Sequence, residues 1–201
     1  QLEGRNAITE ALKSGRTIDK VFVAQGDTDK SLQRLAAQAK EAGAVVVPVD
    51  RRKLDAMSTT RAHQGIIALA AAHEYVTIDD ILEEAAARNE APLIVICDEL
   101  SDPHNLGAIL RSAECAGAHG VIIPKRRSVG LTATVAKASA GAVEYMKVAR
   151  VTNISNAISE LKEKGVWIYG TAAEGSIPMY QADLTGSAAI VIGNEGDGIS
   201  P

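Results

Sequence analysis

Segments with the apolar periodicity of a strand alternate with segments of helical periodicity along almost the whole chain, and this alternation restricts the fold more than any other feature. Strand-like segments are predicted at residues 18–24, 44–49, 65–71, 93–97, 120–123, 146–151, 166–170 and 188–192. Helical periodicity is found at residues 4–12, 31–42, 52–57, 73–91, 105–116, 132–140 and 154–164. Strands that alternate with helices form mostly parallel sheets with helices on both faces. The sequence therefore predicts an α/β protein.

An acidic segment divides the chain, whose 201 residues are enough for one large domain or two small ones. Residues 73–90 carry 6 Asp+Glu against 1 Lys+Arg, whereas residues 1–72 carry 11 Lys+Arg against 8 Asp+Glu. We therefore predict a small α/β domain at 1–72, an acidic linker helix at 73–90 and a second α/β domain at 91–201. The first domain offers the most favourable electrostatic field to a phosphate backbone.

Several protein classes are disfavoured by the composition. No apolar run approaches the roughly 18 residues of a membrane helix, and the N-terminus lacks the layout of a signal peptide. Cys97 and Cys115 have no metal-ligand spacing, and we interpret them as buried free thiols in a reducing compartment. We expect a cytoplasmic protein that needs no metal.

The loop after the strand at 93–97 is the first candidate for chemistry, because ligands of α/β sheets bind beyond the carboxyl ends of strands. It runs from Asp98 to Gly107 into a helix that carries Arg111. Asn105 is expected as the N-cap, and the backbone N–H groups that follow could hold an anion. The alternative interpretation is a capped helix with a surface arginine.

Two further loops follow strands and contain small residues. Gly170–Gly175 follows the strand that carries Trp167, a residue expected in the core rather than beneath a cofactor. Gly193–Gly198 follows the last strand and surrounds Glu195 with glycines. Neither loop has the pattern of a dinucleotide fingerprint or a Walker loop. Each alone is also compatible with a plain turn.

Taken together, these loops resemble the signature motifs of the TrmH-like branch of the SPOUT methyltransferases. Residues 102–111 resemble the first motif and 192–198 the second, and 121–125 and 137–142 match the pattern between them. Residues 4–12 and 63–66 are similar to the ribosomal-protein-like substrate domain of many members. The resemblance covers essentially the whole chain and is closest to the 23S rRNA guanosine-2′-O-methyltransferases.

The resemblance implies 2′-O-methylation of a ribose in structured RNA with S-adenosylmethionine as the cofactor. It also implies a SPOUT domain with a trefoil knot and a homodimer formed through that domain. The catalytic residues would be Asn105, Arg111 and Glu195. Arg111 would anchor the target phosphate and stabilise the developing alkoxide, oriented by the other two. The cofactor would contact Thr171, Ala172, Gly193, Asn194 and Gly196.

Contacts with RNA are expected from basic residues of both domains, each of which could equally be a solvated surface charge. The candidates are Arg5, Arg51, Arg52, Arg61, Lys125, Arg126 and Arg127. Aromatic residues make up only 3% of the chain, which favours recognition of RNA backbone and shape over base stacking. Ribosomal RNA is the expected substrate because the N-terminal domain is present.

The family's third motif would follow Pro201, so this part of the SPOUT domain is absent from the sequence. We therefore expect a half-built cofactor pocket, a mobile Glu195 loop and no bound cofactor in this form. Three alternatives remain. They are a tRNA 2′-O-methyltransferase, a non-catalytic RNA-binding assembly factor, and a nucleotide-binding oxidoreductase. The retained Asn105, Arg111 and Glu195 disfavour the second, and the missing fingerprint disfavours the third.

Overall fold

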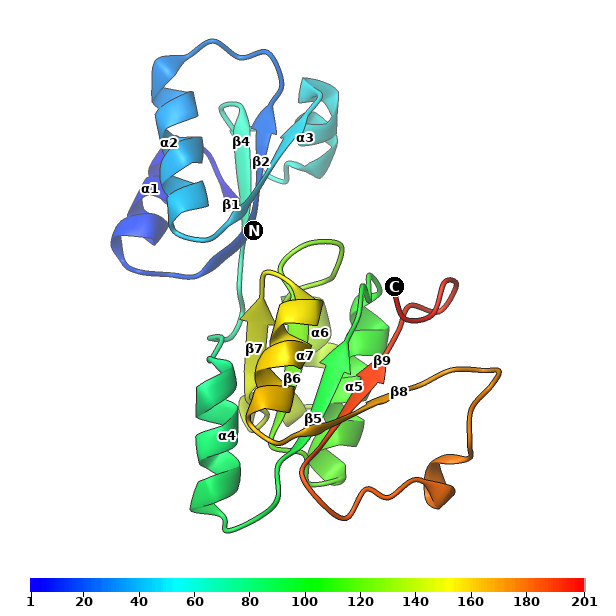
Figure 1. Cartoon of the computed structure of the whole chain (residues 1–201). Coiled ribbons are helices and arrows are strands. Elements are labelled where there is room, and N and C mark those ends of the chain that lie inside the picture. The colour runs from blue at the N-terminus through cyan, green and yellow to red at the C-terminus, as the bar shows by residue number, and fades with distance from the viewer. Residues whose placement is uncertain (201) are drawn as a thin grey trace. The chain divides into compact units, whose positions relative to one another are not determined.

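A computed structural model describes residues 1–200 and divides into two compact units, Gln1–Ala72 and His73–Pro201. The α/β fold expected from the sequence is confirmed, and Figure 1 shows helices packed beside a sheet in each unit. Every helix in the described part of the chain is too short or too polar to cross a membrane.

The first unit is built on a four-stranded sheet in the order β1-β4-β2-β3. Its elements are β1 (Leu2–Glu3), α1 (Arg5–Lys13), β2 (Ile18–Ala24), α2 (Lys30–Glu41), β3 (Val45–Val49), α3 (Arg51–Met57) and β4 (Ile66–Ala70). Strands β2 and β3 are parallel, whereas β4 runs antiparallel to β1 and β2. Apolar residues of α1 and α2 cover one face, and Leu54 of α3 packs with Ile67 in a separate cluster. The short strand β1 has no periodicity of its own, so the sequence does not predict it.

The second unit is built on a five-stranded, fully parallel sheet in the order β7-β6-β5-β9-β8. Its strands are β5 (Leu93–Cys97), β6 (Gly120–Pro124), β7 (Val148–Val151), β8 (Trp167–Gly170) and β9 (Ala188–Ile192). Its helices are α4 (Ile78–Ala87), α5 (Pro103–Cys115), α6 (Ala133–Ala138) and α7 (Ile154–Glu163), with short 3₁₀ turns η1 (Ala142–Glu144) and η2 (Met179–Gln181). The parallel sheet expected for this region is confirmed.

Alternation along the central strands divides the core of the second unit into two layers. Val95 and Cys97 pack with residues of α5 and α6, whereas Ile94 and Ile96 pack with residues of α4 and α7. Side chains of a strand point alternately to the two faces of its sheet, so both faces of β5 are buried. The helices therefore hold β5 at the centre of a three-layer structure.

The acidic segment expected as a linker helix forms α4, which is closely tied to the second unit. Thr77 and Asp80 form a capping box at its start. Ile81 is fully buried in the core layer under α4 and α7, and its side chain occupies the space that a Cβ on Gly120 would fill. Lys147 of the sheet region pairs with Glu84 at 3.2 Å.

Three local expectations were wrong. Helix α5 begins at Pro103 and is capped by Asp102, so Asn105 lies inside the first turn; proline suits the first helical position because no partner is needed there. Trp167 is 73% exposed because β8 is an edge strand. Cys115 is exposed, not buried, because it lies at the last turn of α5 on the side away from the buried Ala113.

Candidate functional site

The order of strands in the parallel sheet creates a crevice between β5 and β9. From β5 the chain adds β6 and β7 on one side, whereas β9 and β8 lie on the other side. The direction in which the chain adds strands therefore reverses between β5 and β9, and such a switch point is where open α/β sheets bind ligands. The loops that leave β5 and β9 both lie at the carboxyl ends of their strands (Figure 1).

The loop after β9 is a closed turn with Glu195 at its exposed tip. The N–H of Asn194 donates to Gly198 O at 2.9 Å, and the N–H of Gly198 donates back to Asn194 O at 3.0 Å. A Cβ on Gly193 would lie 2.1 Å from the carbonyl carbon of Gly198. Only glycine fits at position 193, because the turn folds its own backbone against that position.

Asn105 and Glu195, which are 90 residues apart in sequence, meet across the crevice. The Asn105 side chain, in the first turn of α5, donates from Nδ2 to Glu195 Oε1. The Asp102 cap, which accepts from the N–H of His104 at 2.7 Å, begins the helix and so sets the position of Asn105. The amide thus directs one oxygen of the Glu195 carboxylate and leaves the other oxygen without a partner from Asn105.

Further hydrogen bonds join the loop after β5 to the segment after β9. Asn194 donates from Nδ2 to the carbonyl oxygen of Glu99 at 3.2 Å. The buried carboxylate of Asp98 accepts from both the N–H and the hydroxyl of Ser200, at 2.7 and 2.6 Å. The sequence places Asp98 and Glu99 in a candidate loop but gives neither them nor Ser200 a role, because nothing local in the chain indicates that the two loops meet.

No hydrogen bond or ion pair joins Arg111 to Glu195 in the described residues. The side chain of Arg111 is exposed and has no hydrogen bond or ion pair among the described residues. Six residues separate it from Asn105, which corresponds to about 9 Å along the helix axis and about 120° around it. Arg111 therefore points from another side of α5 and is free to bind a group from outside this chain.

The loop after β8 lies against the end of β9. Both the N–H and the hydroxyl of Thr171 donate to Val191 O, each at 3.0 Å. Thr171 and Ala172 are exposed, and the next side chains are small or point to solvent. The loops after β8 and β9 thus offer exposed backbone next to small side chains, which suits the close approach of a nucleoside.

The thiol at the carboxyl end of β5 is buried. Burial raises the pKa of the Cys97 thiol, at the end of β5, to about 12, so it stays protonated. Within residues 1–200, no group of three or more His, Cys, Asp and Glu side chains could hold a metal ion. The polar groups at the crevice can orient and bind, which favours a reaction that depends on positioning.

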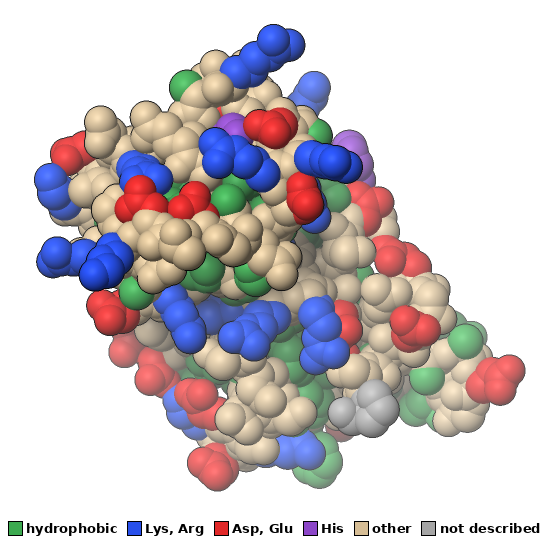
Figure 2. Space-filling model, turned by 90° about the horizontal axis from the view of Figure 1, so that it is seen from above, with side chains coloured by type: hydrophobic (Ala, Val, Ile, Leu, Met, Phe, Trp, Pro, Cys, Tyr) green, Lys and Arg blue, Asp and Glu red, His purple; other side chains and the backbone are tan. Residues whose placement is uncertain are grey.

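Four of the six arginines of the first unit lie at one end of its sheet. Backbone bonds from Ala24 to Gly65 and from Gln25 to Val49 join the ends of β2 and β3 to the start of β4. Four predicted RNA-binding residues flank this end: Arg5, Arg51, Arg52 and Arg61. The last three are exposed and Arg5 is half-buried. In the face seen in Figure 2, Lys and Arg side chains lie among Asp and Glu side chains.

Arg5 differs from the other arginines because it is already paired. Its guanidinium lies 2.6 Å from Asp29 Oδ2 and 2.8 Å from the Ser31 hydroxyl, and it holds the pKa of Asp29 at about 2. Asp29 also caps α2 by accepting from the N–H of Ser31. The other basic candidates, Lys125, Arg126 and Arg127, follow β6, and Arg127 pairs with Glu99 at 3.0 Å.

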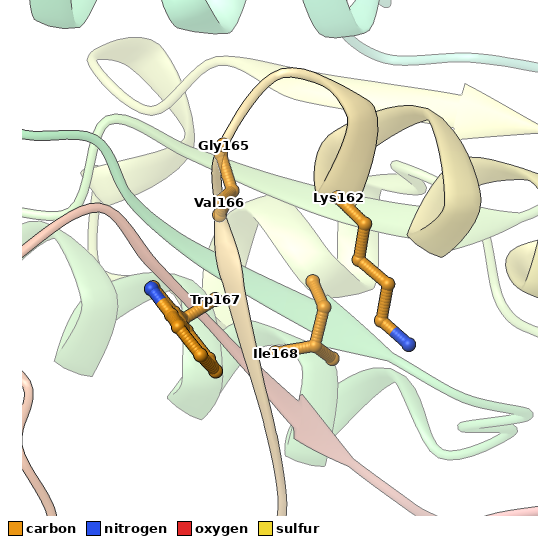
Figure 3. Close-up of a pocket in the computed structure, with 5 residues that line it drawn as sticks. All are labelled: Lys162, Gly165, Val166, Trp167 and Ile168. Atoms are coloured by element: carbon orange, nitrogen blue, oxygen red, sulfur yellow. The ribbon is translucent and has the colours of Figure 1, made fainter.

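A separate apolar depression lies at the amino end of β8. It has a volume of about 470 Å³ and is lined by Lys162, Gly165, Val166, Trp167 and Ile168. Figure 3 shows the flat ring of Trp167 beside the strand and Lys162 extending from α7. Because ligands of such sheets bind at the carboxyl ends, this depression is distinct from the crevice that holds Glu195.

Family models match both units. The SpoU rRNA Methylase family matches residues 92–201, and the model for RNA 2′-O ribose methyltransferase substrate binding matches residues 1–76. The chain is 47% identical over 196 residues to YacO of Bacillus subtilis (strain 168), which carries the name of a TrmH family tRNA/rRNA methyltransferase. This match covers 98% of the chain and 78% of the relative. A similarly named protein of Staphylococcus haemolyticus is 44% identical, over 98% of the chain and 79% of the relative.

Solved structures share the fold at lower identity. The SpoU methyltransferase AviRb from Streptomyces viridochromogenes, in complex with the cofactor AdoMet, aligns with a TM-score of 0.56 and 20% identity, over 99% of this chain and 74% of that one. An rRNA methyltransferase from Sinorhizobium meliloti aligns with a TM-score of 0.56 and 24% identity, over 98% and 72%. The α/β architecture with its parallel sheet is therefore one that other proteins share.

Proposed function

Because the chain belongs to the SpoU rRNA Methylase family, a family of RNA methyltransferases, we propose that it methylates the 2′-hydroxyl of a ribose in structured RNA. The single observation that carries the proposal is the contact of Asn105 with Glu195 across the crevice between β5 and β9. It joins the first turn of α5 to the turn after β9, which are the two segments that resemble the family's motifs.

The cofactor in this proposal is S-adenosylmethionine, which supplies a methyl group on a sulfonium. A protein of the same fold was solved in complex with AdoMet. In this chain two neighbouring loops would hold the cofactor. They contribute the exposed Thr171 and Ala172 after β8, and Gly193, Asn194 and Gly196 after β9. Their small side chains and exposed backbone fit a nucleoside.

The residues of the chain contribute mainly by positioning. When the new O–C bond forms, the bond from sulfur to the methyl carbon would break to leave a neutral thioether, and the proton of the 2′-hydroxyl would pass to solvent. The ribose oxygen carries developing negative charge as that proton leaves. Glu195, oriented by Asn105, accepts a hydrogen bond from the ribose. Arg111 binds the target phosphate and stabilises the developing charge, because a guanidinium remains protonated and is a poor base.

Ribosomal RNA is the proposed substrate, and the first unit is proposed to bind it. Support comes from the substrate-binding model that matches residues 1–76 and from the four arginines at one end of that unit's sheet. Transfer RNA is the second candidate, because relatives carry names that mention both RNAs.

The test is methylation of defined RNA with a labelled methyl donor. Protein incubated with S-adenosyl-[methyl-³H]methionine should label deproteinised ribosomal RNA more than transfer RNA. The labelled linkage should resist alkaline hydrolysis, because a 2′-O-methyl group removes the attacking hydroxyl. Label released as a methylated base would contradict ribose methylation, and no label in either RNA would contradict the catalytic function.

We also propose that the chain forms a homodimer through the second unit. Five large apolar side chains of that unit are at least 63% exposed: Tyr145, Trp167, Ile177, Met179 and Tyr180. Exposed apolar groups of this size are typical of interaction surfaces. Trp167→Glu should leave the fold intact, because the side chain is already in solvent, and should shift sedimentation towards the monomer. A monomeric wild-type protein at micromolar concentration would contradict the dimer.

A further inference from the structure

A polar cleft lies at the carboxyl ends of β5, β6 and β7, beside the crevice that holds Glu195. Its volume is about 720 Å³, and its lining includes Arg126 and Arg127 after β6. Asn153 and Ser155, at the start of α7, form the opposite wall. The cleft extends from β5 towards β7, away from the loop after β8, and Ser200, which follows the turn that carries Glu195, also lines it.

Two carboxylates and two arginines line this cleft, and the two guanidinium groups are the exposed donors that an anion could bind. Asp98 lines the cleft, but this carboxylate is 3% exposed and is satisfied by the N–H and hydroxyl of Ser200. The remaining acidic group is Glu99, which pairs with Arg127 at 3.0 Å. The Arg127 side chain is 80% exposed, so its guanidinium keeps donors for a second acceptor. Arg126 makes no hydrogen bond or ion pair with the described residues, so its donors are also available.

Glu99 of this pair also contacts the turn after β9 that carries Glu195. The carbonyl oxygen of Glu99 accepts from Asn194, the residue before Glu195. Glu99 and Arg127 both have left-handed backbone angles, with φ of 56° and 55°. Non-glycine residues rarely adopt such angles, because the conformation costs free energy that surrounding contacts must offset. The pair therefore joins the cleft to the turn that carries Glu195.

We propose that this cleft binds a phosphate of the RNA strand next to the methylated nucleotide, through Arg126 and Arg127. The inference rests on the proposed function and locates part of its substrate. Arginine suits the role because its planar donors match phosphate oxygens in pairs. An incoming phosphate competes with Glu99 for Arg127, and the RNA strand extends from the crevice over the ends of β6 and β7.

The first experiment measures RNA methylation by a double variant. Arg126→Ala with Arg127→Ala should raise the KM for deproteinised ribosomal RNA about tenfold and leave kcat within twofold. The dependence of log affinity on log salt should fall by about one for the lost phosphate contact. Glu99→Gln removes the competing charge and should lower the KM. A fall in kcat at unchanged KM would overturn the proposal, because the arginines would then act in the chemical step.

A matched control removes two positive charges elsewhere in the same unit. Arg88→Ala with Lys162→Ala changes two exposed residues, one just after α4 and one in α7, and should leave KM and kcat within twofold. Calorimetry with S-adenosylmethionine separates the two sources of an anion, RNA phosphate and the carboxylate of the cofactor. Cofactor affinity should stay within twofold in the Arg126/Arg127 variant, and a tenfold loss would overturn the assignment to RNA.

A second measurement is independent of catalysis. Titration of the wild-type protein with inorganic phosphate, followed by ¹H–¹⁵N NMR, should shift the Nε–H signals of Arg126 and Arg127 and the amide of Ser155. Shifts confined to arginines of the first unit would overturn the subsite. If neither ribosomal nor transfer RNA is methylated, the proposed function fails, and the phosphate titration still decides whether the cleft binds an anion.

Discussion

At the scale of single residues, the site depends on side chains that hold one another in place. Asn105 directs Glu195, Asn194 binds the carbonyl of Glu99, and Ser200 satisfies Asp98. A side chain locked by neighbours loses little conformational entropy when it binds substrate. Arg111 is the exception, because it is exposed and unpaired in the described part of the chain.

The prediction for Arg111 follows from its proposed contact with the phosphate and the alkoxide. Arg111→Ala should lower methylation by about two to three orders of magnitude, and cofactor affinity should stay within a few-fold. Arg111→Lys should also be poor, because an ammonium cannot reproduce the guanidinium fork. Single-turnover kinetics and calorimetry measure the two effects. Near-normal turnover of Arg111→Ala would remove this residue from the mechanism.

A pH dependence follows from Asp29, whose pKa is held at about 2 by hydrogen bonds from Arg5 and then Ser31, below the ordinary 3.8. A depressed carboxyl pKa stabilises the fold above pH 3.8, and this stability is lost as the pH falls towards 2. Asp29→Asn keeps a capping oxygen and removes the charge. The variant should have a lower Tm than the wild type at pH 7. The difference in Tm between the two proteins should narrow between pH 4 and pH 3.

The control for this prediction is Glu10→Gln, which removes a solvent-exposed partner of Lys13. Exposed pairs of this kind contribute little to stability. Its Tm should therefore follow the wild type at every pH. A difference between wild type and Asp29→Asn that is constant from pH 7 to pH 3 would show that the charge of Asp29 does not stabilise the unit.

At the scale of elements, α5 connects the site to the core of the second unit. Its first turn presents Asn105, and its buried residues Leu106 and Leu110 pack against the β5 and β6 side of the sheet. Gly107 lets α6 approach closely, since a Cβ there would lie 2.4 Å from the Cβ of Ala138. The position of Asn105 therefore depends on how α5 packs against α6.

The element-scale prediction is that Gly107→Ala forces α5 and α6 apart. Overpacking of this kind typically costs about 1–3 kcal/mol, more than alanine gains as a better helix former. Urea unfolding should show this loss, and methylation should fall because Asn105 moves. Gly186→Ala is the matched control, because a Cβ at Gly186 meets nothing within 4 Å. Equal stability of the two variants would contradict the close contact.

At the scale of the whole molecule, the chain has two units with separate cores, and we assign RNA binding to the first and methyl transfer to the second. The first unit presents arginines at one end of a mixed sheet, and the second presents the crevice and the Arg126/Arg127 cleft on a parallel sheet. Helix α4 belongs to the core of the second unit, since Ile81 is fully buried there. The boundary that matters for folding is therefore before α4.

A truncation tests this division. A fragment that begins at His73 and extends to the native C-terminus should fold, bind S-adenosylmethionine and lose RNA affinity. A fragment that begins at Ala91 lacks α4 and exposes the apolar face that Ile81 covers, so it should unfold at lower urea concentration. RNA binding by the full chain should weaken steeply with salt. Undiminished RNA affinity of the His73 fragment would show that the first unit is not the RNA-binding part.

The amino-acid sequence by itself determined the order of the helices and strands apart from β1, and the segments in which Asn105, Glu195 and Thr171 lie. These features could be predicted because apolar periodicity, caps and glycine turns depend on neighbours close in the chain. The motifs at residues 102–111 and 192–198 also indicated the family, because each is a short continuous stretch of the chain. The extents of most elements differ from the prediction by only a few residues at their ends.

Only the tertiary structure decided which loops meet. The placement of β9 between β5 and β8 brings Glu195 to Asn105 and Asn194 to Glu99, and it leaves Trp167 on an exposed edge. Strand neighbours in a parallel sheet are distant in sequence, and periodicity reports that a strand is buried but not which strand lies beside it. In the same way, the pairing of β5 with β6 brings Glu99 to Arg127 and so forms the polar cleft.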